Sequence, residues 1–135
     1  MYLVTKRIDF CYGHRLLDYD GICKHPHGHN AVVEVDVRTD RLDKRNMVVD
    51  FSDIKRVVKG WIDRELDHKM ILRHDDPLVA PLEALGEPIY KIDSNPTVER
   101  IAKLIFDHAR EQGIDVVAVR VWETPTSVAT YSDNK

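Results

Sequence analysis

Two of the seven histidines in this chain, His27 and His29, are separated by a single glycine. Apolar and polar residues alternate from His27 to Thr39, which predicts a β-strand with both histidines on its apolar face. His14 ends an earlier stretch with strand character that can pair beside this one. Three imidazoles that leave one position open are typical of catalytic zinc, whereas structural zinc sites fill all four positions with protein ligands. The pattern therefore predicts zinc (Zn²⁺) bound by His14, His27 and His29.

Cys23 stands close to this pair, in the order Cys-x-x-x-His-Gly-His. A thiol becomes a usable base when a cation or a histidine lowers its pKa. The adjacent Asp67 and His68 directly follow an amphipathic helical stretch. Such a pair is a weak signal by itself, and it gains weight from a cysteine and a metal site elsewhere in the chain. His25 precedes a proline in a loop, and we do not expect it to bind the metal.

Glu123 lies in a valine-rich stretch that reads as a buried strand. A buried carboxylate is costly unless it meets a hydrogen-bond donor. Two interpretations stay open on the pattern alone. Glu123 is either exposed at the end of its strand, or it faces a pocket and accepts two N–H bonds from a guanidine-like ring edge, as in guanine or a pterin.

Strands and helices must position these side chains. The spacing of apolar residues changes several times along the chain, between the period of a strand and that of a helix. Period-two patterns predict strands at 2–14, 27–39, 47–51, 89–92, 114–123 and 128–131. Helical spacing predicts one helix over 54–66, capped by Ser52 or Asp50, and another that starts at 95–97 and ends at Gly113. Three prolines and a glycine mark 73–88 as a long irregular connection.

This order of elements predicts an α+β fold, with an antiparallel four-stranded sheet that carries two helices on one face. Such a small sheet has two open edges, which other subunits can close into an oligomeric β-barrel. The length of 135 residues favours a single domain spanning 1–135.

Composition excludes several classes of protein. No apolar run is long enough for a membrane span, and the N-terminus lacks the features of a secretory signal. Lys and Arg number 20 against 23 for Asp and Glu, which gives no electrostatic footprint for nucleic acid or an anionic membrane. Two cysteines build no disulfide framework, so we expect a cytoplasmic protein.

With these residues in view, the sequence resembles the 6-pyruvoyltetrahydropterin synthase and 6-carboxytetrahydropterin synthase family over nearly its whole length. The stretches that carry the resemblance are 10–16 (FCYGHRL), 23–30 (CKHPHGHN), 47–55 (MVVDFSDIK), 66–68 (LDH), 95–99 (NPTVE) and 122–125 (WETP). The resemblance implies the tunnelling fold (T-fold), in which trimers close a β-barrel and two trimers stack as a hexamer.

Carried over by position, the resemblance implies zinc on the three histidines named above. It also implies that Cys23, Asp67 and His68 form the acid–base group and that Glu123 anchors a pterin. The implied partners are a small pterin substrate and copies of the same chain.

Three residues between the cysteine and His-Gly-His resemble the bacterial 6-carboxytetrahydropterin synthases of the queuosine pathway. This implies conversion of 7,8-dihydroneopterin triphosphate to 6-carboxytetrahydropterin, with loss of acetaldehyde and triphosphate. Ile71 and Leu72 stand where the family often has Leu-Asn, and the connection 69–94 is longer than usual. The alternatives are a pyruvoyl-type synthase, which eliminates triphosphate without cleaving the carbon chain, and a non-catalytic zinc- or pterin-binding protein. Cys23 and the Asp67–His68 pair count against the second, since binding alone does not require them.

Overall fold

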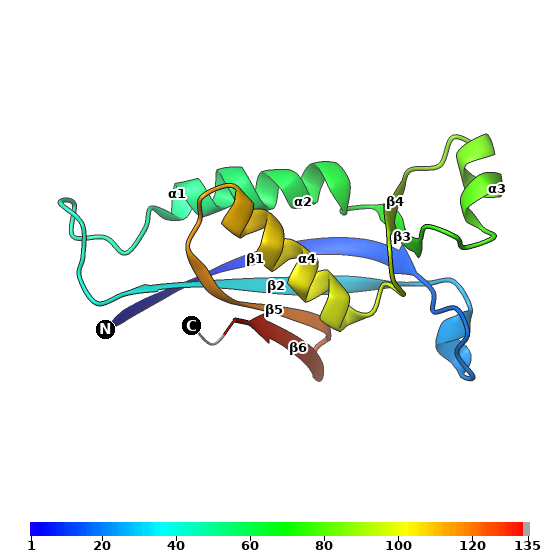
Figure 1. The fold of residues 1–135 in the computed structure, drawn as a ribbon, viewed down its shortest axis with the longest axis horizontal. Helices are drawn as coiled ribbons and strands as arrows, with labels where there is room; N and C mark the ends of the chain where they lie inside the picture. Colours follow the sequence, from blue (N-terminus) through cyan, green and yellow to red (C-terminus); the bar gives the residue numbers. More distant parts are fainter. Residues whose placement is uncertain (134–135) are drawn as a thin grey trace.

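The computed structural model describes residues 1–133, so residues 134–135 of the predicted domain 1–135 lie outside it. Six strands form one mixed sheet in the order β4-β3-β1-β2-β5-β6 (Figure 1). The strands are β1 (Tyr2–His14), β2 (His27–Thr39), β3 (Lys69–Arg73), β4 (Ile89–Ile92), β5 (Val116–Thr124) and β6 (Ser127–Ser132). The helices are η1 (Ile22–Lys24), α1 (Phe51–Ile54), η2 (Lys55–Lys59), α2 (Gly60–Glu65), α3 (Val79–Ala84) and α4 (Val98–Glu111).

β1 and β2 form the long central pair, as the alternation predicted. They run antiparallel without a register shift, from Tyr2 opposite Thr39 to His14 opposite His27. Directly opposed residues of an antiparallel pair face the same side of the sheet. The register therefore brings His14 and His27, two of the three predicted metal-binding histidines, together at one end of the pair.

One face of the sheet carries the hydrophobic core. The alternating positions of β1, β2 and β5 that face it pack against apolar residues of α1, η2, α2 and α4, and both long helical segments cover this face (Figure 1). The fully buried members with large side chains include Ile8, Val33, Val35, Ile54, Val58, Ile62, Ile101, Ile105 and Val116. The prediction of two helices on one face is confirmed.

Both long helical segments begin where the sequence places a capping residue. Asp50 accepts a hydrogen bond from Ser52 N, so Asp50, rather than Ser52, caps the segment 51–65. This segment runs through α1, η2 and α2, with η2 wound as a π-helix. Thr97 caps α4 by accepting from Arg100 N, and Gly113 beyond its end has a φ of 89°, a value that favours glycine.

The predicted returning strand at 47–51 is wrong. Residues 47–50 join no strand, and helix α1 starts at Phe51. The Asp43 carboxylate accepts hydrogen bonds from the backbone N–H groups of Arg45 and Met47 and so holds a turn just before this stretch. Asp50 then caps the helix, which leaves no room for a strand between the two.

The predicted four-stranded antiparallel sheet is present as β1, β2, β5 and β6, but the complete sheet is larger and mixed. β3 adds in parallel to the free edge of β1 and β4 adds in parallel to β3. The stretch 73–88, predicted to be irregular, contains the short helix α3. Among the described residues no helix is both long and apolar enough to cross a membrane.

Candidate metal centre and its surroundings

The structure brings His14, His27 and His29 together at the end of the β1–β2 pair. One ring nitrogen from each lies within 4.8 Å of those of the other two. The Nε2 atoms of His14 and His29 are 3.2 Å apart. The sequence prediction that these three residues form one group is confirmed, and the group offers three nitrogen donors to one ion.

Backbone carbonyls fix two of the rings. His14 Nδ1 lies 2.7 Å from Pro96 O, and His27 Nδ1 lies 2.7 Å from His25 O. A carbonyl only accepts, so each Nδ1 carries the proton and each Nε2 keeps its lone pair for a metal. His25, which we did not expect as a ligand, contributes its backbone instead of its ring.

Burial also favours the protonation state that a metal requires. It lowers the pKa of His14 and the pKa of His29, which keeps both imidazoles neutral at neutral pH. Metal ions bind the neutral imidazole. Three ring nitrogens, with no fourth ligand in the group among residues 1–133, fit a zinc ion that keeps one position open.

Glu123, on β5, lies beside this group. Its Oε1 is 3.5 Å from His29 Nε2, and its side chain is 25% exposed. The carboxylate is therefore neither fully exposed at the end of a strand nor buried. It lies where it can contact a molecule that approaches the histidines.

Tyr12 is a member of this site that the sequence interpretation did not assign. Its ring centroid is 5.0 Å from that of His14 and 5.7 Å from that of His29. The side chain is buried, which raises the pKa of its phenol, so the hydroxyl stays protonated. Tyr12 has the same strand parity as His14, a signal that was available in the sequence.

Asp67 and His68 form a turn that is bound to β1 at Cys11. The Asp67 carboxylate accepts from Cys11 N at 2.9 Å, and His68 N donates to Cys11 O at 2.7 Å. His68 Nδ1 lies 2.7 Å from Asp67 Oδ2, so the carboxylate orients the ring. Burial opposes ionisation, but the hydrogen bonds from Cys11 N and His68 lower the pKa of Asp67. His68 has a φ of 60°, uncommon for a residue with a side chain.

The structure places Cys11, and not the expected Cys23, beside Asp67 and His68. Cys11, Asp67 and His68 offer ligand atoms within 4.8 Å of one another, and no such group of three among residues 1–133 contains Cys23. Cys23 lies half-buried on η1, where its carbonyl accepts from Leu16 N at 2.9 Å. A group of Cys23, Asp67 and His68 is thus not formed within the described part of one chain, and it stays a prediction for an assembly.

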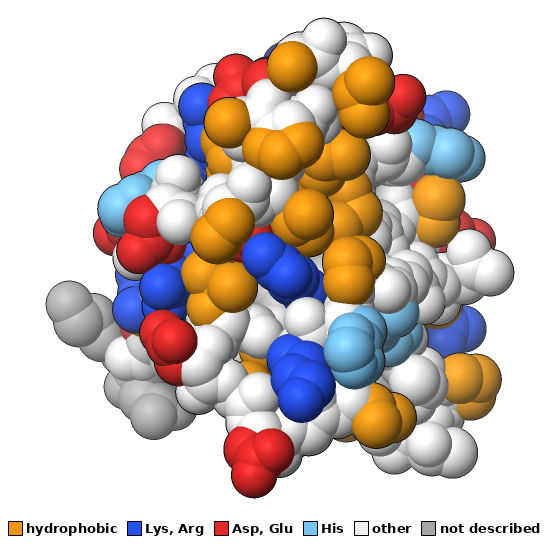
Figure 2. Space-filling view, turned by 90° about the vertical axis from the view of Figure 1, so that its right-hand side faces the viewer, with side chains coloured by type: hydrophobic (Ala, Val, Ile, Leu, Met, Phe, Trp, Pro, Cys, Tyr) orange, Lys and Arg blue, Asp and Glu red, His pale blue; other side chains and the backbone are white. Residues whose placement is uncertain are grey.

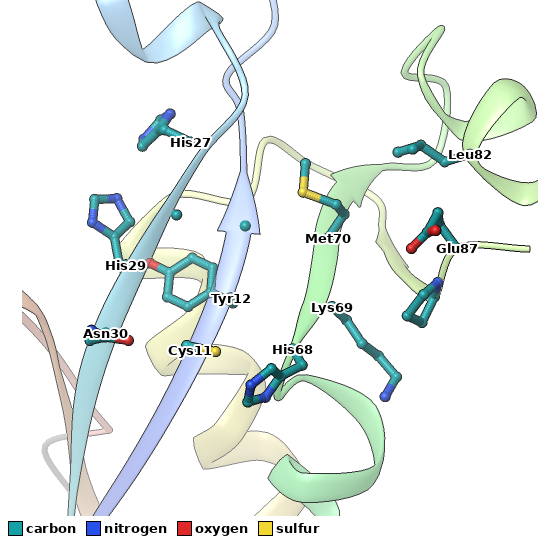
Figure 3. Close-up of a pocket in the computed structure, with 13 residues that line it drawn as sticks. Cys11, Tyr12, His27, His29, Asn30, His68, Lys69, Met70, Leu82 and Glu87 are labelled. Atoms are coloured by element: carbon teal, nitrogen blue, oxygen red, sulfur yellow. The ribbon is translucent and has the colours of Figure 1, made fainter. Parts of the chain in front are cut away.

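A cavity of about 640 Å³ opens beside the Cys11 group. It is bounded by β1 and β2 on one side and by the segment around α3 on the other (Figure 3). The residues that line it include Cys11, Gly13, Gly28, His68, Met70, Leu82, Glu87 and Pro88. Met70 packs so closely over Gly13 that an added Cβ there would lie 2.4 Å from its sulfur.

His27 and His29 also border the cavity, but their rings point to the other side of β2 from Met70 (Figure 3). Figure 2 views this end of the molecule. Hydrophobic side chains gather in its upper half, and basic and histidine side chains lie below them.

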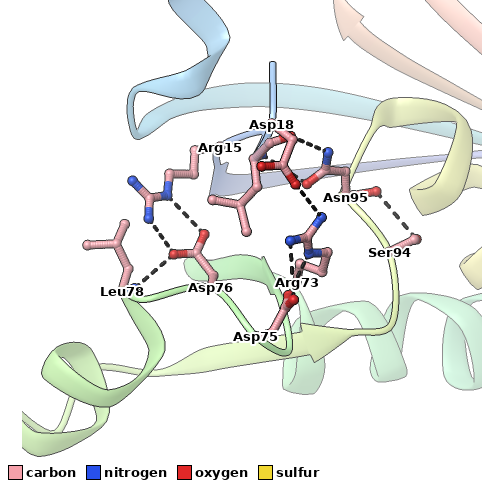
Figure 4. Close-up of polar contacts among 9 residues, drawn as sticks. Arg15, Asp18, Arg73, Asp75, Asp76, Leu78, Ser94 and Asn95 are labelled. Carbon is pink, nitrogen blue, oxygen red and sulfur yellow. Dashed lines mark hydrogen bonds and ion pairs between the residues drawn. The ribbon is translucent and has the colours of Figure 1, made fainter. Parts of the chain in front are cut away.

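Ion pairs and hydrogen bonds hold the loop that joins His14 to Cys23 (Figure 4). Arg15 binds the buried carboxylate of Asp76 through two nitrogens, one of them at 2.9 Å. The Asn95 side chain donates to Leu17 O and accepts from Leu17 N. Because Asn95 precedes the residue whose carbonyl binds the His14 ring, the same segment positions the metal ligand and this loop.

Comparison with known proteins places this geometry in context. The profile of a family described as 6-pyruvoyl tetrahydropterin synthase matches residues 3–134. A protein of Rickettsia felis named 6-carboxy-5,6,7,8-tetrahydropterin synthase is 40% identical over 128 residues, covering 90% of this chain and 93% of the relative. A protein of the same name from Haemophilus influenzae is 30% identical over 141 residues, covering 98% of this chain and all of the relative.

Two proteins of solved structure share the fold. An uncharacterized protein of Wolinella succinogenes matches with a TM-score of 0.82 at 28% identity, covering 98% of both chains. The 6-pyruvoyl tetrahydropterin synthase of Caenorhabditis elegans matches with a TM-score of 0.72 at 23% identity, covering 99% of this chain and 98% of that one. The expectation of a tunnelling-type α+β fold is confirmed at the level of the single chain.

Proposed function

This chain belongs to the 6-pyruvoyl tetrahydropterin synthase family, and we propose that it is a zinc-dependent 6-carboxy-5,6,7,8-tetrahydropterin synthase. It acts on 7,8-dihydroneopterin triphosphate and releases acetaldehyde and triphosphate, a step of queuosine biosynthesis. The observation that carries the proposal is the group of three imidazoles with a carboxylate, Glu123, beside it. Relatives that bear this name at 30–40% identity over most of their length support the carboxy product over the pyruvoyl product.

His14, His27 and His29 hold the zinc ion in this proposal. When bound, zinc polarises the side-chain oxygens of the substrate and makes the adjacent C–H bond more acidic. The chain itself provides neutral donors with fixed orientation, because Pro96 O and His25 O hold two of the rings. Zinc analysis of His27→Ala tests the assignment. We expect a strong loss of zinc, and retention of a full equivalent would contradict it.

Glu123 binds the ring of the pterin. A carboxylate accepts two parallel N–H bonds from the edge of such a ring, and this contact fixes the substrate side chain relative to the histidines. The distance of 3.5 Å between Glu123 and His29 supports this arrangement, because one small molecule can reach both. The contribution is one of position.

Cys23 and His68 move the protons. Cys23 as thiolate takes a proton on one side of the substrate, and His68 exchanges one on the other through Nε2, since its Nδ1 is bonded to Asp67. Strand parity separates His68 from the histidine group within one chain. Asp67 and His68 form a group with the Cys11 side chain, which is on the opposite face of β1 from His14.

The proposal therefore includes an oligomer, most simply a hexamer, with active sites near subunit boundaries. The open sheet edges at β4 and β6 and the exposed Tyr2, Leu3 and Phe51 support it. We expect light scattering to give a multiple of the mass of one chain. We also expect a mixture of His27→Ala and His68→Ala chains, refolded together, to regain activity that neither has alone. An active monomer would contradict the oligomer.

The deciding experiment is incubation of the zinc-loaded protein with 7,8-dihydroneopterin triphosphate, followed by analysis of the products. We expect 6-carboxytetrahydropterin together with acetaldehyde and triphosphate. Triphosphate without acetaldehyde would instead establish the pyruvoyl-type reaction, the second candidate, which the family description favours. Pterin binding with no product would leave a binding protein and overturn both enzymatic assignments.

A further inference from the structure

The Tyr12 hydroxyl has no hydrogen-bond partner. Among residues 1–133 it is the only fully buried side-chain nitrogen or oxygen in this condition, in a side chain that is 3% exposed. Hydroxyls are rarely buried without a partner, because the lost bonds to water are not replaced. The residues around Tyr12 indicate why its hydroxyl is buried without a partner.

The ring is held firmly and its polar end faces the histidines. Phe10, two residues earlier on the same face of β1, stacks on the Tyr12 ring at a centroid distance of 5.3 Å. The hydroxyl end lies toward His29 and away from Met70 and the cavity (Figure 3). The His14 ring meets the Tyr12 ring edge-on at 80°. The hydroxyl is thus aimed at the histidine group, in which the Nδ1–H groups of His14 and His27 are already bonded to carbonyls.

We propose that the Tyr12 hydroxyl is a fixed hydrogen-bond donor to an oxygen atom of the molecule that occupies the open side of the histidine group. The inference rests on the metal site of the proposed function and not on the identity of the reaction. Glu123 accepts only, and three histidine nitrogens would bind the metal, so Tyr12 offers this site a neutral O–H donor. A preorganised O–H in a buried site favours an oxygen that carries or develops negative charge, such as a carboxylate, an alkoxide or an enolate.

The same geometry explains why the donor is unpaired in the chain alone. A phenol that already donated to Glu123 would have to break that bond before it could meet a ligand. In this structure Glu123 is close enough to act on the phenol electrostatically, yet no hydrogen bond joins the two. The donor is therefore kept ready for a ligand.

Tyr12→Phe tests the proposal, because it removes only the hydroxyl. The zinc content should be unchanged, since the three ligands remain. The melting temperature of the metal-free variant should be equal to that of the unaltered protein or higher, because no protein bond is lost and an unpaired polar group is removed. A clear fall in melting temperature would mean that the hydroxyl has a partner in the protein and would overturn the proposal.

The second measurement uses cobalt(II)-loaded protein and acetate as the probe, followed by visible absorption of the cobalt ion. We expect Tyr12→Phe to weaken acetate binding about ten- to a hundredfold, the range expected for one hydrogen bond to a charged oxygen. Tyr90→Phe is the matched control, because Tyr90 is a partly buried tyrosine that packs on Trp61 instead of the histidines. Equal acetate affinities in the unaltered protein and Tyr12→Phe would overturn the proposal.

The outcomes separate this inference from the proposed reaction. If Tyr12→Phe weakens acetate binding while the unaltered protein forms no 6-carboxytetrahydropterin, the donor stands and the assigned reaction falls. If the reaction is observed but acetate affinity is insensitive to Tyr12→Phe, the donor falls and the reaction stands. Failure of the unaltered protein to bind cobalt would overturn the metal site on which both depend.

Discussion

We expect Asp76 to contribute strongly to the stability of the loop beside the histidine group. Its side chain is completely buried, and it accepts two hydrogen bonds from Arg15 and one from Leu78 N. Asp76→Ala leaves the Arg15 guanidinium without its partner. Breaking a buried ion pair by removing one member costs about 3–5 kcal/mol, and because Arg15 is 19% exposed we expect the lower end, about 3 kcal/mol.

That loss is measured as the free energy of unfolding in urea or as a melting temperature. For a chain of this size, about 3 kcal/mol corresponds to a fall of roughly 10 °C. Asp75→Ala is the matched control, because the neighbouring Asp75 forms an exposed ion pair with Arg73 and should change the melting temperature little. Equal losses for Asp75→Ala and Asp76→Ala would refute the reasoning from burial.

The effect of Asp76 should also depend on pH in a defined direction. The hydrogen bonds from Arg15 lower the pKa of Asp76 below that of the unfolded chain. A carboxyl with a lowered pKa stabilises the folded state above its unfolded pKa, about 3.9, and the stabilisation is lost as the pH falls through the folded value. The difference between the unaltered protein and Asp76→Ala should therefore be full at neutral pH and shrink below about pH 4. A difference that is constant down to pH 2 would argue against an ionised Asp76.

Three further predictions concern the site itself. Cys23→Ala should lower kcat by about 10²–10⁴-fold with near-normal pterin binding, because an acid–base group acts mainly in the transition state. Cys11→Ala is the comparison, and a larger loss of kcat there would assign the acid–base role to Cys11. Glu123→Ala should weaken pterin binding first, by roughly 1–3 kcal/mol, as titration of the pterin would measure, because its hydrogen bonds exist in the ground state. The metal-free protein should lose stability as the pH falls below about 6.5. In that range unfolded imidazoles take up protons that the buried His14 and His29 resist, and a stability that does not change from pH 7 to pH 5 would contradict this.

The part of the fold that the sequence predicted best is the β1–β2 pair. Its alternation extends over two strands of 13 residues each, and a slip of one residue would move every apolar side chain to the wrong face. Because of this constraint, the alternation alone predicts on which face of the sheet His14, His27 and His29 lie. Local patterns also sufficed for the capped helices, whose apolar faces and caps lie within a few residues of each other.

The parts that were missed depend on contacts distant in sequence. β3 pairs with β1 over only three residues, Tyr12 to His14, and its parallel pairing leaves no signature in a five-residue apolar stretch. Helix α3 has six residues, contains Pro81 and closely follows Pro77, so its pattern resembles a loop. The link between Cys11 and the Asp67–His68 turn consists of one hydrogen bond from Cys11 N to the Asp67 carboxylate and one from His68 N to Cys11 O, and composition or periodicity cannot indicate these.

The same contrast between locally determined and distant contacts applies to the candidate functional side chains. His14, His27 and His29 lie on adjacent strands in direct register, so one chain completes the histidine group by itself. The Asp67–His68 turn forms a group with the Cys11 side chain, which is on the opposite face of β1 from His14, so one chain holds this turn away from its own histidine group. An oligomer can bring the Asp67–His68 turn of one chain to the histidine group of another, because an open sheet edge allows a second copy to pack against the first. Under the proposed function, metal binding is therefore expected of the folded single chain, whereas proton transfer at the metal is expected only of the oligomer.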